Sequence, residues 1–504
     1  MDIPGSFAAM GEGLSIIVQP TTIIAIVIAT CIGLVIGIIP AIGGLVAASL
    51  FIPLVYRMSP DIALPFLVSL VSVVYTGGCI TTILLGIPGT APNAATLIDG
   101  FPMTQKGEGG KAIGAAITAS MFGGVFPVFI SLLIIPVIRP IVLALKAPEM
   151  FMIILLGLSF LGVLASESKI KGLISGFAGI LFSMFGLHIV TGEYRFTFGI
   201  QSLSSGLDLI AIALGLFAFG EMFDTIAKGQ KSIADTDRLV VRSDVLSGMI
   251  EVWKHKWLWL RSTLIGYVVG IFPGIGGDVA MFVAYSQAKM TSKRPEEFGT
   301  GCIEGVIAPE SANNAKESGA LLTTMAFGIP GSAVMAILMA GFLVTGVVPG
   351  PKLLTESLPL VFALQIGIAV ANIIAGVLAL VLATKLAKIS SVHIDFMFPI
   401  VLALVCLGCY ITNGRFIDMI TVCIFGVIGF VMKRLNFSRA ALILGFVLGN
   451  MFENYFWRAY KLSGPTFWIT PGSIIILAII ILVFFAPLLQ KLLRLLSQKG
   501  KGAS

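Results

Sequence analysis

The sequence TTILLGIPG at residues 81–89 returns as TTMAFGIPG at residues 323–331, and both copies interrupt long apolar stretches. Proline stops a helix because it lacks an N–H group and its ring collides with the preceding turn. The neighbouring glycines tolerate the backbone conformations that such a stop needs. Each copy therefore predicts a helix that breaks at Gly-Ile-Pro-Gly and restarts a few residues later.

A second pair of sequences precedes these two copies in the same order. Residues 33–44 read GLVIGIIPAIGG, and residues 266–277 read GYVVGIFPGIGG. Two ordered Pro/Gly patterns at matching places indicate an internal duplication. We expect a first membrane repeat at 1–226, a cytoplasmic linker at 227–257, and a second membrane repeat at 258–504 that ends in a basic tail.

The composition places this duplication in a membrane. Of 504 residues, 57% are hydrophobic and only 11% are charged, whereas soluble domains carry about 25% charged residues. Several runs contain no charge at all, namely 13–56, 62–98, 112–138, 318–351, 357–384 and 462–490, and a spanning helix needs about 20 apolar residues. The sequence predicts an all-α polytopic membrane protein with about 12 transmembrane helices in two pseudo-symmetric, inverted repeats with broken or re-entrant helices. It excludes a soluble enzyme and a disordered or fibrous protein.

The net charge of +7 does not point to nucleic acid in such a protein. Basic residues gather in cytoplasmic loops of membrane proteins. Residues 227–261 hold seven of them, and the tail carries Lys491, Arg494, Lys499 and Lys501. We therefore expect the linker and the C-terminus inside the cell and the N-terminus outside.

Duplicated halves with broken apolar helices are typical of secondary transporters. Irregular backbone at membrane depth is tolerated only where it is buried or lines a wet cavity, so the breaks should locate the binding site. The residues expected to shape the breaks are Pro40, Gly43, Gly44, Pro88, Gly89, Pro273, Gly276, Gly277, Pro330 and Gly331.

Polar residues follow the first break. We expect Thr90 to cap the next helix, with Pro92 in its first turn, so that the positive helix end points at the break. Asn93 and Thr96 lie three residues apart on one helix face and are candidate ligands of substrate or ion. Asp99 ends an uncharged run and either belongs to the site or marks the membrane surface.

The second half offers further candidate ligands in Glu310, Ser311, Asn313, Asn314 and Ser332. Ser311 is expected to cap a helix whose start then carries the two asparagines. A charge at bilayer depth costs about 2.5–3.5 kcal/mol, so a buried Glu310 must face water, an ion or a partner. The alternative is an acid that caps the helix at the membrane surface.

The uncharged windows around both Gly-Ile-Pro-Gly breaks contain no Lys or Arg, and Lys106, Lys111 and Lys316 are the nearest cations in sequence. An anionic substrate would then depend on helix N-termini, amides and hydroxyls, or on a bound cation such as sodium. We expect no cofactor and no resident metal, because the histidines are isolated. The pair Cys406 and Cys409 is interpreted as core packing.

Several longer motifs resemble the large permease subunit of the bacterial tripartite tricarboxylate transporters. They are PAIGG at 40–44, ATLIDGFPM at 95–103, PGIGGD at 273–278, APESANNA at 308–315 and GIPGS at 328–332. The likeness spans the whole chain, with Ala41 as a departure where we expect glycine in the family.

The resemblance implies an inner-membrane importer of citrate-like carboxylates that is driven by an ion gradient, usually of sodium, without ATP. It also implies two partners, a small four-span membrane subunit and a periplasmic solute-binding protein. An inverted-repeat architecture would imply an elevator-like or rocking movement of the motif-bearing regions.

Two other classes of function remain open from the residues. A channel-like or structural membrane protein would not need two paired breaks. An intramembrane enzyme would need paired His, Asp, Glu or Ser groups, and the sequence places no such pair.

Overall fold

The structure is a computed structural model that describes residues 3–39, 43–159, 169–188, 190–227, 244–272, 277–387 and 414–481, with isolated positions between 399 and 410. Pro40, Pro273, Gly276 and Cys406 lie outside these ranges, as do most of the expected linker and the basic tail.

The first part of the chain is almost entirely helical. Its elements are α1 (Ile3–Val18), α2 (Pro20–Ile38), α3 (Gly44–Phe51), α4 (Pro60–Leu85), α5 (Ala94–Gln105), α6 (Gly109–Ala144), α7 (Ala147–Ser159), α8 (Lys169–Ser183), β1 (Gly186–Leu187), β2 (Tyr194–Arg195), α9 (Leu209–Ala213), a π-helix (Leu214–Phe219) and α10 (Gly220–Ala227). The two short strands pair antiparallel and are a small addition to the all-helical architecture expected from the sequence.

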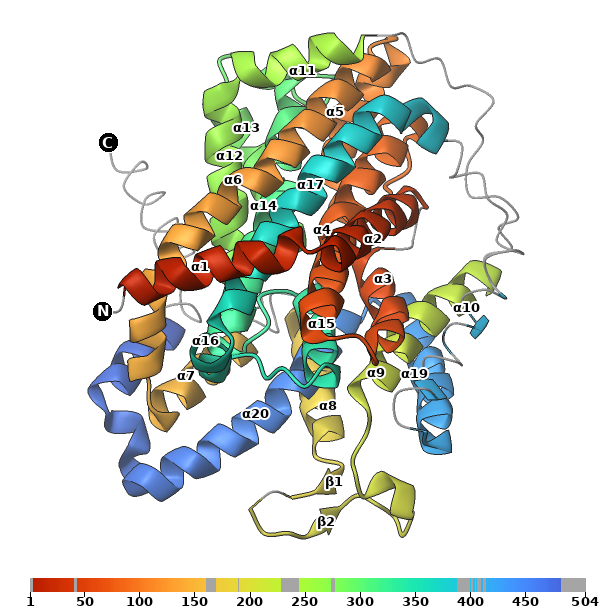
Figure 1. Ribbon diagram of the computed structural model, residues 1–504. Helices are drawn as coiled ribbons and strands as arrows, with labels where there is room; N and C mark the ends of the chain where they lie inside the picture. The colour runs from red at the N-terminus through yellow and green to blue at the C-terminus, as the bar shows by residue number, and fades with distance from the viewer. Residues whose placement is uncertain are drawn as a thin grey trace, which may run out of the picture.

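The second part of the chain is also helical. Its helices are α11 (Val245–Lys254), α12 (Lys256–Ile271), α13 (Gly277–Thr291), α14 (Glu304–Phe327), α15 (Ala333–Val344), α16 (Pro351–Glu356), α17 (Leu358–Ala387), α19 (Phe416–Arg434) and α20 (Arg439–Ser463). Figure 1 shows α11 at one end of the molecule and the β1–β2 hairpin at the other. The long helices α6 and α17 run beside each other between these ends.

The chain is a multi-pass membrane protein by the length and apolarity of its helices. Five described helices are long and apolar enough to span a membrane, and a sixth candidate is the pair Arg439–Ile469 and Pro471–Ile481, which is bent by 61°. The predicted count of about 12 is not confirmed. One physical reason is that five further apolar helical segments, Gly44–Val55 and Ala333–Val344 among them, have only 10–17 residues and are too short to cross alone.

Helices α4 and α14 form the centre of the fold. Residues 63–84 of α4 and 305–326 of α14 are buried throughout. Helix α2 packs on α4, while α6, α12 and α13 pack on α14, and the two central helices touch each other. Because apolar neighbours surround them, these helices can carry polar side chains on faces that meet neither lipid nor water.

The central helices end in the same manner. Gly86 after α4 has φ +69°, and Gly328 after α14 has φ +70°. Glycine adopts this left-handed conformation at little cost and commonly ends a helix with it. Short helices, α5 and α15, follow the two breaks.

Equivalent hydrogen bonds hold the two breaks. Thr82 Oγ1 donates to the Gly78 carbonyl at 2.7 Å and accepts from the Gly89 N–H at 3.0 Å. Thr324 Oγ1 makes the same pair of bonds, to the Ala320 carbonyl at 2.7 Å and from the Gly331 N–H at 3.2 Å. In each break, one threonine hydroxyl thus connects the turn to the helix that precedes it.

Two predicted helix starts are wrong. Helix α14 begins at Glu304, and Ser311 lies in its interior, where its hydroxyl donates to the Ile307 carbonyl at 2.6 Å. Pro309 lies at the sixth position of this helix, where it removes only one helical hydrogen bond. Thr90 does not cap α5, which begins at Ala94 after a series of turns.

Candidate functional site

One face of α14 carries a buried polar row. Glu310, Asn313, Asn314 and Glu317 are at most 1% exposed. Their spacing of three, four and seven residues puts them on the same side of a helix. This side faces α4 and α5, as the contacts of Glu310 and Asn314 show.

The Glu310 carboxylate lies at the start of α5. Its Oε1 accepts a hydrogen bond from Thr96 Oγ1 at 2.6 Å and one from Asn93 Nδ2 at 3.2 Å. Its Oε2 accepts from Asn313 Nδ2 at 3.2 Å. Together these hydrogen bonds satisfy both oxygens of the buried side chain. An acid from the second half is therefore bound by residues that follow the first break.

Asn93 joins this carboxylate to the central helix α4. Its Oδ1 accepts from the Thr90 hydroxyl at 2.5 Å, and its Nδ2 also reaches the Tyr75 carbonyl at 3.3 Å. Asn93 thus fixes the turn after the break, although Thr90 was expected to do so by capping.

Asn314 forms a separate cluster of hydrogen bonds about one turn further along α14. Its Nδ2 donates to Thr76 Oγ1 at 2.7 Å and to Asn372 Oδ1 at 2.5 Å. Among the residues that the structure describes, Asn313 Oδ1 and Asn314 Oδ1 accept no hydrogen bond although both are buried. Amide oxygens of this kind are ligands that small hard cations accept.

Lys316, which lies outside the uncharged windows around the two breaks in the sequence, is found in the same buried region of the structure. Lys316 is 1% exposed, and its Nζ lies 3.7 Å from the centre of the Tyr75 ring and 3.6 Å from Glu317 Oε1. Nothing in the sequence pattern indicated that its side chain turns inward, because its position on α14 is not on the row that holds Glu310.

The predicted site residues therefore fall into three groups. Thr90, Asn93, Thr96, Glu310 and Asn313 come together in one buried network, and Asn314 lies in a neighbouring cluster with Thr76 and Asn372. Ser311 bonds within its own helix, and Ser332 caps α15 by accepting from the Met335 N–H at 3.2 Å. Pro88, Gly89, Pro330 and Gly331 lie in the two breaks, Gly43 and Gly44 lie at the start of α3, and Gly277 begins α13.

Asp99 is neither a surface marker nor a direct part of the Glu310 network. It is fully buried, and its Oδ1 accepts from the N–H groups of Gly299, Gly301 and Cys302 at 2.8–2.9 Å. Its Oδ2 accepts from the Tyr285 hydroxyl at 2.8 Å. Asp99 thus ties α5 to the loop that leads into α14.

We expect Asp99→Asn to lower the free energy of unfolding by about 2 kcal/mol, since hydrogen bonds to a charged acceptor contribute about 1.5–3 kcal/mol. The measurement is the thermal midpoint of the purified protein in detergent. Tyr285→Phe is the matched control because it removes only one of the four hydrogen bonds, and it should cost about 1 kcal/mol. Equal midpoints for Asp99→Asn and the wild type would contradict this role.

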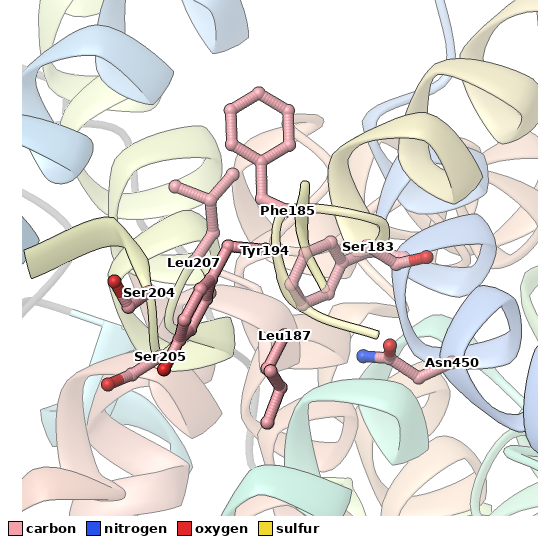
Figure 2. A pocket seen from close by; sticks show the side chains of 10 residues that line it. Ser183, Phe185, Leu187, Tyr194, Ser204, Ser205, Leu207 and Asn450 are labelled. Atoms are coloured by element: carbon pink, nitrogen blue, oxygen red, sulfur yellow. The ribbon is translucent and has the colours of Figure 1, made fainter. Parts of the chain in front are cut away.

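A surface cavity of about 450 Å³ lies elsewhere, between the β1–β2 hairpin and α20. Figure 2 shows Ser183, Tyr194, Ser205 and Asn450 around it. Arg195 of the hairpin binds Glu453 of α20 through both guanidinium nitrogens at 2.7 and 2.8 Å. Because the cavity lining described here carries no charged side chain, it offers no counter-charge for a carboxylate, and the buried network is the better candidate site.

Comparisons with known proteins point to one family. The family model described as "Tripartite tricarboxylate transporter TctA family" matches residues 23–444. A protein of Agrobacterium vitis, named as an uncharacterized 52.8 kDa protein in the TAR-I ttuC' 3' region, is 32% identical over 454 residues, which cover 90% of this chain and 89% of that protein. A second protein of Agrobacterium vitis, named as an uncharacterized protein in the TAR-II ttuC' 3' region, is 35% identical over 198 residues, which cover 39% of this chain and 82% of that protein. No solved structure matches.

Proposed function

Because the chain belongs to the tripartite tricarboxylate transporter TctA family, we propose that it is the large membrane subunit of a cation-coupled secondary importer of tricarboxylates or related organic carboxylates. In this proposal a periplasmic solute-binding protein delivers the substrate, and a small four-span membrane subunit completes the complex. The complex lies in the bacterial inner membrane, and sodium is the coupling ion. The family is one of transporters and not of enzymes.

The contact between Glu310 and the start of α5 carries this proposal. It joins the two broken segments through a buried acid that Thr96 and Asn93 bind directly. An ionised side chain is expensive at membrane depth and commonly marks a substrate or ion pathway there. A channel-like or structural membrane protein, the alternative function, has no need for such an acid between α14 and the segment after the first break.

Sodium coupling is supported by the chemistry of the buried oxygens. Glu310 supplies a carboxylate, and Asn313 and Asn314 each supply an amide oxygen that accepts no hydrogen bond from the described residues. A small cation bound to these oxygens would lower the negative charge of the site before an anion approaches.

The matching hydrogen bonds of Thr82 and Thr324 support the proposed duplication. Close helix contacts match as well. A Cβ added to Gly37 would lie 1.9 Å from the Val74 carbonyl oxygen, and one added to Gly270 would lie 2.2 Å from the Lys316 carbonyl oxygen. We propose that the two halves are inverted repeats and that the region holding both breaks moves during transport.

The test is uptake into proteoliposomes that contain the complete complex. Labelled citrate should accumulate only under an inward sodium gradient, and its initial rate should saturate with citrate concentration. Liposomes with an equal gradient of choline are the control. Accumulation that survives the collapse of every ion gradient would contradict coupling, and a flux that never saturates would favour the channel-like alternative.

A further inference from the structure

Lys316 occupies an unusual position for a basic side chain. It is 1% exposed within α14, one residue away from the equally buried Glu317. Burying an ammonium group costs several kcal/mol unless other groups compensate. The Tyr75 ring and the Glu317 carboxylate are compensating groups, at 3.7 Å and 3.6 Å from Nζ.

The contact with Glu317 is looser than a hydrogen-bonded ion pair. An N–H···O bond to a carboxylate is about 2.7–2.9 Å long, whereas Lys316 Nζ and Glu317 Oε1 are 3.6 Å apart. The attraction at this distance is mainly coulombic, so an anion that approaches Nζ directly could compete with Glu317.

The Tyr75 ring places this ammonium group between the two halves. The Tyr75 carbonyl accepts from Asn93, which binds Glu310. Its hydroxyl oxygen would lie 3.3 Å from a Cβ added to Gly44 at the start of α3, and that Cβ would lie 3.5 Å from Val334 at the start of α15. Two helix N-termini therefore begin beside the ring that holds Lys316, and helix N-termini favour carboxylates.

The charges of the buried row explain why a cation would bind before the anionic substrate. The row holds two carboxyl groups, those of Glu310 and Glu317, and Lys316 supplies one ammonium group beside them. Such a row repels an anion until a cation binds its carboxylates. Asn314 Oδ1 is a suitable ligand for that cation because it accepts no hydrogen bond from the described residues and lies three residues from Glu317 on the same helix face.

We propose that Lys316 receives a carboxylate group of the transported anion, and that the coupling cation frees it by taking Glu317 as a ligand. This inference rests on the proposed function and adds to it the group that links ion binding to substrate binding. Lys316 exchanges one carboxylate, that of Glu317, for another, that of the substrate.

The test measures binding to the full complex in lipid nanodiscs as the shift of its thermal midpoint. The probes are sodium chloride, with choline chloride as reference, and citrate, succinate and acetate as tricarboxylate, dicarboxylate and monocarboxylate. Lys316→Met should keep the shift caused by sodium and weaken carboxylate binding at least about 30-fold. Lys316→Arg should recover part of that loss. The control is Lys352→Met, since Lys352 lies 3.6 Å from Glu356 at an exposed site and should behave like the wild type.

Glu317→Gln should have the opposite effect on carboxylate binding, which a purely structural ion pair between Lys316 and Glu317 would not produce. Without its competitor, Lys316 should bind the carboxylate in choline as well as in sodium. The inference is overturned if Lys316→Met binds the carboxylates within twofold of the wild type, or if Glu317→Gln folds and still requires sodium to the wild-type extent. A wild-type complex that responds to neither sodium nor carboxylate would instead contradict the proposed function itself, and this inference with it.

Discussion

Glu310→Gln should lower sodium-driven uptake by roughly 100-fold, which corresponds to about 2.7 kcal/mol. Glutamine has nearly the same shape, so it can keep the hydrogen bonds from Thr96 and Asn93. Glutamine carries no charge, however. Its amide nitrogen would also face Asn313 Nδ2, which is a donor and bonds to Glu310 Oε2 in the wild type. The site therefore loses its attraction for a cation while the helices stay packed.

Initial uptake rates at a saturating sodium gradient, normalised to the amount of folded protein, would measure this effect. The matched control is Glu297→Gln, because Glu297 is 44% exposed in its side chain and pairs with Arg294 at the surface. Uptake by Glu310→Gln within threefold of the wild type would remove Glu310 from the candidate site.

The second large effect should come from Gly89→Ala. The added Cβ would lie 2.4 Å from Gly78 Cα and 2.6 Å from the Gly78 carbonyl oxygen. Both are backbone atoms, so no side-chain rotation can relieve the clash. Overpacking of this kind costs about 1–3 kcal/mol and at times more. We expect a cost of about 3 kcal/mol together with a loss of uptake, because the turn after the first break could not keep its present contact with α4.

The thermal midpoint in detergent and the uptake rate would be measured together. Gly331→Ala should behave in the same manner, since its Cβ would lie 2.6 Å from Ala320 Cα. Gly11→Ala is the control because no atom lies within 4 Å of its added Cβ. A Gly89→Ala protein as stable as Gly11→Ala would show that the break is not tightly packed against α4.

The breaks were predictable because proline and glycine act locally. The repeated Gly-Ile-Pro-Gly sequences end α4 and α14 at Gly86 and Gly328, as the pattern indicated. The candidate residues Asn93, Thr96 and Glu310 could be chosen because polar groups in apolar runs need partners. Their mutual contact could not be predicted, because it joins residues more than 200 positions apart.

Other features depended on packing that no local pattern encodes. Ser311 was expected to cap the start of a helix, but neighbouring helices stabilise a continuous α14 from Glu304 onward. The inward position of Lys316 follows from the Tyr75 ring on another helix. Asp99 ended an uncharged run, and sequence alone could not distinguish an acid at the membrane surface from one that binds three distant N–H groups.

The Asp99 contacts have a pharmacological consequence. They join the segment after the first break to the loop that precedes α14, and Glu310 adds a further connection between the same parts. We therefore expect the segment after the first break and the loop before α14 to move together. A small molecule bound between them should inhibit transport with one molecule per chain.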